Sequence, residues 1–305
     1  MGRRFEPVWA HYDKVMSVKL LIRIFKALIR RIYWLAQRTF LPFGISILFL
    51  DPINFKHLRI SKFTPNENLL DFFKNLRPIR NGYELVRVGS NSDSGYLVPN
   101  DFEGISHCFS AGCDKKWTFE LDLEKRFGIY SHIIDSEDKK PNDLTPKHTY
   151  TPKWLGAKSA KSTLTMDDWI SLSSSEDDAE YILQMDIEGY EWLTLSNLDI
   201  NFLLKFRILI IEFHGSKNLI NKKHFDETFK PTVDQLVKHF DPVHIHGNNC
   251  CGLVSYGQFV FPEVFELTLH RKDRLKTNEG YSDLPNSLDS KNLPEKDELI
   301  VTWPW

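Results

Sequence analysis

The sequence predicts an α/β protein. A mostly parallel sheet is covered by helices on both faces, ends in one or more antiparallel strands, and follows an N-terminal helical extension. From residue 105 onward, short apolar runs alternate with segments of helical periodicity, the order that builds a parallel sheet. The run 208–213 (ILIIEF) is apolar without alternation, as in a strand buried on both faces. The run 265–270 (FELTLH) alternates, which suits an antiparallel strand at the end of the sheet.

The elements are expected in this order along the chain. A helix at 66–76 ends before Pro78, because proline disfavours helical geometry in the residue that precedes it. Residues 83–88 and 96–98 are strand-like and flank a polar turn as the two arms of a hairpin. The remaining strands are expected at 105–109, 129–134, 181–185, 207–213, 243–246, 252–254 and 265–270, and the remaining helices at 117–127, 165–172, 192–204 and 232–240. Residues 136–160 are polar and rich in proline and lysine, which predicts a long loop.

Composition and charge narrow the function classes. The 305 residues are 42% hydrophobic and 26% charged, values that exclude a mostly disordered protein and a multi-span membrane protein. The formal net charge of −2 conceals an asymmetry: residues 1–40 carry nine Lys or Arg against two Asp or Glu, a net of +7, which leaves −9 for the rest. An acidic body argues against a nucleic-acid partner, which requires a basic face. Four cysteines without a CxxC pair argue against a structural zinc site or a disulfide framework, and so favour a reducing, cytoplasmic location.

The basic N-terminal segment predicts an amphipathic helix over residues 18–36. Its charges at Lys19, Arg23, Lys26 and Arg30 fall on one helical face, and they interrupt the apolar run too often for a membrane-spanning helix or a signal peptide. Such a helix suits the surface of an anionic membrane, where it would hold the protein peripherally. The alternative is an ordinary helix docked on the body with a solvated basic stripe.

Three parts are therefore expected. Residues 1–62 form the basic helical segment, residues 63–271 the α/β domain, and residues 272–305 a polar tail that is loosely ordered. Met16 is a second candidate start, because the basic helix opens directly after it.

Polar residues follow the predicted strands at five places. In an open α/β sheet, ligands bind outside the carboxyl ends of the strands, so these residues are the candidates for a site. Gly112 lets a ligand approach the backbone closely, and Asp135 is placed to accept hydrogen bonds from ribose hydroxyls. Asp186 stands directly at a strand tip, and Glu191 is explained by the preference of acids for the first turn of a helix. The set Asp186, Glu212 and His214 suits a divalent metal ion or acid–base chemistry.

Several segments carry a resemblance to a known family. Residues 164–169 (LTMDDW) followed by 185–191 (MDIEGYE) resemble the LDD … K-I-D-V-E-G-x-E pattern of FkbM-type S-adenosylmethionine-dependent methyltransferases. Residues 87–96 (RVGSNSDSGY) are similar to the R-x-G-x-x-x-D-G-G-Y segment of a branch that includes animal methyltransferase-like proteins. Further similar segments are 110–120 (SAGCDKKWTFE), 211–214 (IEFH), 244–249 (HIHGNN) and 262–268 (PEVFELT). The resemblance covers about residues 83–271, and Ser94 stands where the branch usually has glycine.

The resemblance implies a Rossmann-like methyltransferase with S-adenosylmethionine as cofactor. It places Asp135 at the ribose and Asp186 beside the reactive methyl group. The implied cofactor-binding residues are Ser110, Gly112, Asp114, Asp135 and Asp186. The implied acceptor is a hydroxyl on a sugar, a glycolipid or another small polar molecule.

The expected chemistry is in-line transfer of a methyl group to that hydroxyl, with removal of its proton. Asp186 or His214 is the candidate base, and Glu188 is a third catalytic candidate. A bound divalent ion would instead lower the pKa of the hydroxyl and orient it. The predicted substrate-binding residues are Arg87, Asp93, His246 and Asn248.

Two other readings of the same residues stay open. One is a metal-dependent hydrolase or sugar-modifying enzyme that uses Asp186, Glu212, His214 and His246. The other is a non-catalytic, membrane-associated protein on a methyltransferase-like fold, which the lack of a glycine-rich loop after the first strand would suit.

Overall fold

The computed structural model describes residues 41–51, 56–136, 144–174, 179–299, 301, 303 and 304. The chain divides into two compact units, one formed by Met1–Thr64 with Ile220–Lys223 and the other by Pro65–Leu219 with His224–Trp305. In the first unit, a 3-10 helix (Leu41–Phe43) precedes β1 (Ile45–Asp51), which pairs antiparallel with β2 (Lys56–Lys62). The predicted amphipathic helix over 18–36 lies outside the described residues.

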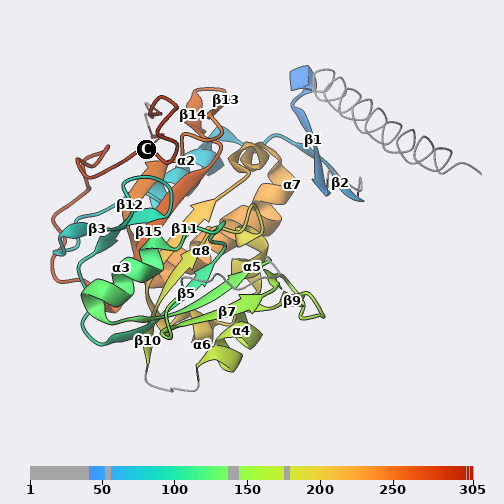
Figure 1. The fold of residues 1–305 in the computed structure, drawn as a ribbon. Coiled ribbons are helices and arrows are strands. Elements are labelled where there is room, and N and C mark those ends of the chain that lie inside the picture. Colours follow the sequence, from blue (N-terminus) through green and yellow to red (C-terminus); the bar gives the residue numbers. More distant parts are fainter. Residues whose placement is uncertain are drawn as a thin grey trace, which may run out of the picture. The chain divides into compact units, whose positions relative to one another are not determined.

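The second unit is built on a seven-stranded sheet in the order β12-β15-β11-β10-β5-β6-β7 (Figure 1). The strands from β11 to β7 are parallel to one another, and β15 is antiparallel to both of its neighbours. The strands are β5 (Ile105–Ala111), β6 (Tyr130–Asp135), β7 (His148–Pro152), β10 (Glu180–Met185), β11 (Phe206–Phe213), β12 (Phe240–Gly247) and β15 (Phe265–Arg271). This mostly parallel sheet with an antiparallel strand near its end confirms the predicted Rossmann-like methyltransferase fold class.

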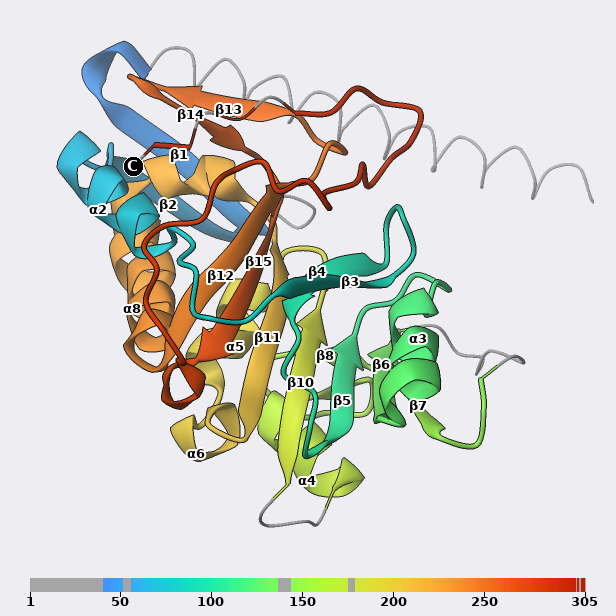
Figure 2. The ribbon, with the colours of Figure 1, turned by 90° about the vertical axis from the view of Figure 1, so that its left-hand side faces the viewer.

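Both faces of the sheet are covered, because alternate residues of each strand point into two separate cores. Phe109 and Leu183 belong to the larger core, whereas their neighbours Cys108 and Ile182 belong to the smaller one. The larger core is closed by α2 (Asn66–Asn75), α4 (Met166–Ser173), α5 (Glu191–Asn197) and α8 (Lys230–His239). The smaller is closed by α3 (Thr118–Phe127) and the hairpin of β3 (Leu85–Gly89) and β4 (Gly95–Pro99), which cross the same face in Figure 2.

Short elements complete the described part of the chain. They are β8 (Trp154–Leu155), β9 (Thr163–Leu164), α6 (Ile200–Leu203), a 3-10 helix (Ser216–Ile220), α7 (Lys222–His224), a π-helical turn (Phe225–Phe229), the hairpin of β13 (Leu253–Tyr256) and β14 (Phe259–Pro262), and a 3-10 helix (Lys272–Arg274).

Two expected elements differ in the structure. The loop expected over 136–160 contains β7, an edge strand in which only His148 is buried, so its sequence carries no hydrophobic pattern. The helix expected over 192–204 is two helices, α5 and α6. The second begins at Asp199, whose carboxylate accepts the Asn201 N–H at 2.7 Å and caps the new helix.

The tail differs from the loosely ordered segment that was expected. Residues 272–299 contain little regular structure, yet their side chains hydrogen-bond to the last strands of the sheet. Asp289 Oδ1 pairs with His244 Nε2 at 2.8 Å, and Asn292 Nδ2 donates to Glu266. Because these contacts are polar, they could not be predicted from an apolar pattern in the sequence.

Two further expectations concern the cell compartment and the membrane. Within the described ranges, no helix is both long enough and apolar enough to cross a membrane. The structure joins the adjacent Cys250 and Cys251 in a disulfide, while Cys108 and Cys113 carry free thiols.

Candidate active site

The candidate site lies at the carboxyl ends of the parallel strands. Gly112 follows β5, Asp135 ends β6, Asp186 follows β10 and His214 follows β11. Since these four strands are parallel neighbours, their ends meet at one edge of the sheet. The fold therefore brings together residues that are more than 100 positions apart in the sequence.

Gly112 is where two of these strand ends touch. Its φ is +76°, in the left-handed region, and a Cβ placed on it would lie 1.6 Å from the carbonyl oxygen of Asp186. The Asp186 N–H donates to the Ala111 carbonyl at 2.8 Å, and the Gly112 N–H donates to the Ile134 carbonyl at 3.0 Å. Only glycine permits this approach, which fixes the position of Asp186 beside the loop after β5.

Asp135 holds the loop that follows Gly112. Its Oδ2 accepts the backbone N–H groups of Cys113 at 3.0 Å and of Asp114 at 3.3 Å. Asp114 and Lys115 both have positive φ values, 38° and 62°, so the loop makes a tight turn at the strand ends. Asp135 thus anchors the loop of the site, although its own side chain does not line the recess described next.

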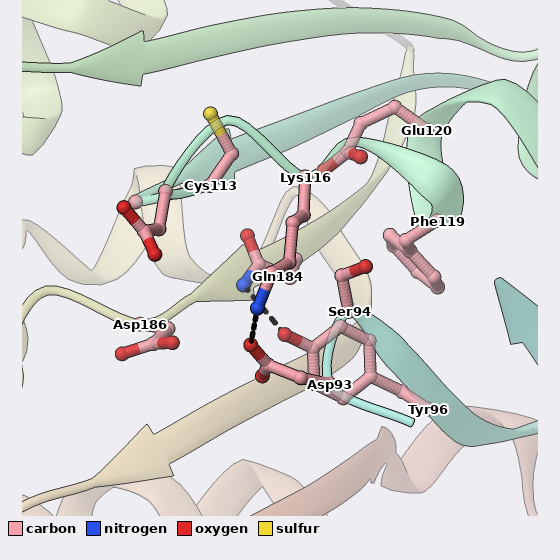
Figure 3. A pocket seen from close by; sticks show the side chains of 11 residues that line it. Asp93, Ser94, Tyr96, Cys113, Lys116, Phe119, Glu120, Gln184 and Asp186 are labelled. Carbon is pink, nitrogen blue, oxygen red and sulfur yellow. Dashed lines mark hydrogen bonds and ion pairs between the residues drawn. The ribbon is translucent and has the colours of Figure 1, made fainter. Parts of the chain in front are cut away.

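A small recess, partly open to solvent, is bordered by this loop (Figure 3). Four carboxyl groups line it, from Asp93, Asp114, Glu120 and Asp186, against the single ammonium of Lys116. Lys116 Nζ pairs with Asp93 Oδ2 at 2.7 Å, as the figure shows. The remaining lining residues are Ser94, Tyr96, Gly112, Cys113, Phe119 and Gln184. The excess of acids favours a ligand that carries positive charge.

A buried polar network lies against the recess. Ser110 Oγ is within hydrogen-bonding distance of Glu120 Oε1 and lies 2.8 Å from Gln184 Oε1, while Gln184 Nε2 donates to Tyr96 Oη at 3.1 Å. A hydroxyl has one proton and Gln184 Oε1 only accepts, so the network is complete when Glu120 carries a proton and donates it to Ser110. Burial accordingly raises the pKa of Glu120 to about 7.

The sequence singled out one member of this network and missed the other three. Ser110, a predicted cofactor-binding residue, is fully buried and does not line the recess. Glu120, Gln184 and Tyr96 were not predicted. The available signal was a polar residue at an inward position: Gln184 lies inside the apolar run 181–185, and Glu120 lies beside the buried Phe119 of α3.

A second group of side chains surrounds His214. Its Nδ1 lies 3.1 Å from Glu191 Oε1, and the same oxygen accepts the N–H groups of Ile187 and Gly189, both at 3.0 Å. Glu191 is fully buried. It is therefore a structural anchor of the turn 186–190 and of the histidine, a larger role than that of a helix-terminal acid. Trp192 Nε1 fixes the histidine backbone by donating to the His214 carbonyl at 2.8 Å.

The other ring nitrogen of His214 faces three carboxylates. Its Nε2 lies 3.8 Å from Asp186 Oδ1, 3.7 Å from Glu188 Oε2 and 3.4 Å from Glu212 Oε1. The predicted set of Asp186, Glu212 and His214 is thus brought together. Glu188 reaches the group from the surface, with its side chain 83% exposed. Asn248, predicted to bind substrate, donates to both carboxylate oxygens of Glu212 at 3.1 Å.

Burial and mutual repulsion perturb the titration of this group. Burial raises the pKa of Asp186 to about 7, against the opposing effect of His214. Burial, with Asp186 nearby, also raises the pKa of Glu212 well above its ordinary value. Burial lowers the pKa of His214, but the hydrogen bond with Glu191 and the adjacent carboxylates outweigh it and raise the pKa to about 9.

Three of the four predicted substrate-binding residues, Arg87, His246 and Asn248, do not line the recess. The Arg87 guanidinium donates to backbone carbonyls of Ser90 at 2.7 Å and Gly95 at 3.0 Å, and so holds the turn of the β3–β4 hairpin. His246 faces Glu266, with Nδ1 at 3.8 Å from its Oε2, and Glu298 of the tail. Asp93, the fourth of these residues, lines the recess.

Two solved structures are similar to this chain. TrmK from M. capricolum, in complex with the cofactor product S-adenosylhomocysteine, has 9% sequence identity and a TM-score of 0.30, covering 61% of this chain and 69% of TrmK. The fibrillarin pre-rRNA processing protein from Methanococcus jannaschii has 10% identity and a TM-score of 0.33, covering 75% of this chain and 98% of that protein. No protein-family model and no curated protein matches the chain. The order and direction of the chain's own strands show the Rossmann-like sheet.

Proposed function

We propose that this chain is an S-adenosylmethionine-dependent methyltransferase that methylates a hydroxyl on a sugar, a glycolipid or another small polar acceptor. The observation that carries the proposal is the carboxylate-lined recess at the carboxyl ends of a Rossmann-like methyltransferase sheet. The FkbM-like motif 185–191 supports it, because this motif supplies Asp186 and Glu191 to the site. S-adenosylmethionine, when bound, supplies an electrophilic methyl group on a positively charged sulfur.

The charge of the recess suits such a cofactor. Asp93 is paired with Lys116 and Glu120 carries a proton, so Asp114 and Asp186 are the acids that would attract a cation and repel the phosphates of a dinucleotide. The close approach at Gly112 leaves backbone, and no side chain, at the floor between β5 and β10.

The chain's own residues would divide the work between binding and proton removal. Gly112 and Asp114 would hold the methionine part of the cofactor, and Asp135 would hold its ribose. Asp186 is the carboxylate on the recess wall and would accept the proton of the acceptor hydroxyl. His214, whose Nδ1 is engaged by Glu191, would orient Asp186 and is the weaker candidate for the base.

Calorimetric titration of the full-length protein with S-adenosylhomocysteine, in EDTA, tests the proposal directly. We expect micromolar affinity. The Asp135→Ala variant should weaken binding by about 1–3 kcal/mol, because it removes the anchor of the 113–114 loop and the expected ribose contact. Asp283→Ala, a fully exposed carboxylate of the tail, is the matched control and should bind as the wild type does.

The opposite results would favour the other readings. A folded protein that binds no S-adenosylhomocysteine would contradict the proposal. Metal-dependent hydrolysis of a sugar ester by that protein would then support the hydrolase reading, and absence of both activities would support a non-catalytic role. If binding is confirmed, the Asp186→Asn variant should lose methyl transfer, whereas retained turnover would remove Asp186 from the chemistry.

A further inference from the structure

The distances around His214 Nε2 are unusual for a hydrogen-bonded histidine. Three carboxylate oxygens lie 3.4–3.8 Å from this nitrogen, too far for normal hydrogen bonds. In a tetrahedral metal site with bonds of about 2.0–2.2 Å, neighbouring ligand atoms are about 3.3–3.6 Å apart. The separation of Nε2 from Glu212 Oε1, 3.4 Å, falls in this range, and its separation from Asp186 Oδ1, 3.8 Å, lies close to it.

The other face of the imidazole is held as in a metal-bound histidine. Glu191 Oε1 engages Nδ1 at 3.1 Å and is itself fixed by the backbone N–H groups of Ile187 and Gly189. A carboxylate that accepts the Nδ1 proton leaves the Nε2 lone pair directed toward the three acids. This carboxylate–histidine arrangement is the usual outer support of a metal ligand.

Two buried carboxylate oxygens of the group lack a hydrogen-bond partner. Among the residues that the structure describes, Asp186 Oδ1 and Glu191 Oε2 are inaccessible and unpaired. The Glu191 side chain is fully buried, and single ligand atoms of Asp186, Glu191 and His214 lie within 4.8 Å of one another. Buried unpaired carboxylate oxygens are costly, and a cation placed among them would offset that cost.

We propose that a divalent cation binds at this point, held by His214 Nε2, Asp186 Oδ1 and Glu212 Oε1. Glu188 reaches the ion from the surface, and Glu191 is the positioning residue that sets the ring. One imidazole with carboxylate oxygens, and no thiolate, suits a first-row divalent ion such as Mn²⁺ or Zn²⁺. Asn248 holds Glu212 through both of its oxygens and completes the outer shell.

The place of the ion adds a catalytic role to the proposed function. That role rests on the proposed function, whereas binding of the ion does not. Asp186 belongs both to the recess wall and to the ligand group, so the ion would lie next to the acceptor hydroxyl. There it would lower the pKa of the hydroxyl and so ease proton removal. The competing arrangement is a doubly protonated His214 in an ion-pair cluster that binds no metal.

Manganese binding by the EDTA-treated and desalted full-length protein tests the site. Electron paramagnetic resonance of free Mn²⁺ should show one bound ion per chain with micromolar affinity, and the spin-echo spectrum of the bound ion should show coupling to an imidazole nitrogen. Asp186→Asn and Glu212→Gln should weaken binding by tenfold or more. His214→Gln should abolish the nitrogen coupling. Glu191→Gln should weaken binding by about 10- to 100-fold, the usual effect of losing an outer-shell carboxylate.

The controls separate this site from others and from loss of folding. His132→Gln changes a buried histidine of β6 in the same way and should leave Mn²⁺ binding unchanged. Thermal unfolding of each variant identifies any that fails to fold, and the three ligand variants serve as substitutes for one another. No binding at millimolar Mn²⁺, or binding that the ligand variants leave unchanged, would overturn the proposal.

The two proposals fail separately, because each is measured without the other ligand. Binding of S-adenosylhomocysteine in EDTA together with no Mn²⁺ binding would leave the methyltransferase proposal and remove the ion. Binding of Mn²⁺ with no binding of S-adenosylhomocysteine would leave the metal site and remove the methyltransferase.

Discussion

Gly112 is the residue at which the smallest chemical change should have the largest effect. A methyl group there would collide with the Asp186 carbonyl oxygen, and the φ of +76° is itself unfavourable for alanine by roughly 1–2 kcal/mol. We expect Gly112→Ala to lower the unfolding temperature and to weaken S-adenosylhomocysteine binding strongly.

Gly104→Ala is the control for the backbone effect alone. Gly104 has a similar φ of +80°, but a Cβ there meets only Arg207 Nη2 at 3.5 Å. It should show the cost in stability without the loss of binding. Equal binding by the two variants would mean that the contact between Gly112 and Asp186 does not shape the site.

Glu120 should give the folded protein a characteristic pH dependence. Its pKa in the fold is about 7, above the ordinary 4.5, so the folded state holds a proton that the unfolded state has released between these values. Its contribution is complete below pH 4.5 and is lost as pH rises to 7, by roughly 3 kcal/mol. We expect Glu120→Gln to remove this loss, so that the variant gains stability relative to the wild type between pH 5 and pH 8 in urea unfolding.

Glu67→Gln provides the comparison for this pH effect. Glu67 also lies in the first turn of a helix, α2, but it is exposed. The Glu67→Gln variant should have the same unfolding free energy as the wild type at pH 5 and at pH 8. If the unfolding free energy of the wild type instead changed with pH in parallel with that of Glu120→Gln, Glu120 would be ionised in the fold.

Residues at strand tips could be predicted from the sequence, and residues that depend on burial could not. The proximity of Asp186, Glu212 and His214 could be predicted because a strand pattern fixes where the chain reaches the sheet edge. Glu191 was missed because an acid in a first helical turn has an ordinary explanation, and its contact with His214 arises only when β10 and β11 lie side by side.

At the scale of elements, Asp101 fastens the segment after β4 to three other elements. Its carboxylate accepts from Arg274 Nε and Nη2 at 2.8 and 2.9 Å, and it also meets Arg207 of β11 and His270 of β15. Its removal would leave the buried Arg207 without one of its acids. We therefore expect Asp101→Ala to destabilise the fold by about 3–5 kcal/mol in chemical unfolding.

Asp283→Ala is again the control, because its carboxylate is fully exposed. This variant should unfold as the wild type does. A small effect of Asp101→Ala would show that the existing partners of the buried arginine, the Glu180 carboxylate and the Glu103 carbonyl, are sufficient to hold it.

The positions of the buried strands could be predicted from the sequence, whereas the edge strand β7 could not. Buried strands such as β10 and β11 have continuous apolar runs, whereas β7 presents mostly polar residues to solvent. The break between α5 and α6 was hidden because a local capping interaction at Asp199 interrupts a helix-like pattern.

At the scale of the whole molecule, the basic segment 1–40 makes a prediction that the described residues do not address. Its net charge of +7 should hold the protein on vesicles that contain phosphatidylserine, and deletion of 1–40 should release it in a sedimentation assay. Neutral vesicles and raised salt are the controls, because both should weaken an electrostatic attachment. Equal sedimentation of the two proteins would show that the segment has another partner.

The tail shows why composition alone underestimates order in this molecule. Asp289 and Asn292 place polar groups against the strands, and Asn249 Nδ2 donates to the Leu293 carbonyl at 2.9 Å. Each contact pairs groups that are distant in sequence, so none of them could be predicted without the folded sheet. A polar tail can therefore belong to the same compact unit as the core.

The two outermost strands of the sheet bear on how the protein behaves in concentrated solution. β7 and β12 are the edges, and an uncovered edge offers unpaired backbone groups to a second chain. Each contains a proline, Pro152 and Pro242, that has no N–H to offer, and the Ile79 N–H already occupies the Pro242 carbonyl at 2.8 Å. Lys147 and Lys153 flank β7 with like charge. Both margins thus discourage edge-to-edge aggregation, and a proline-to-valine change at either one would open a route to it.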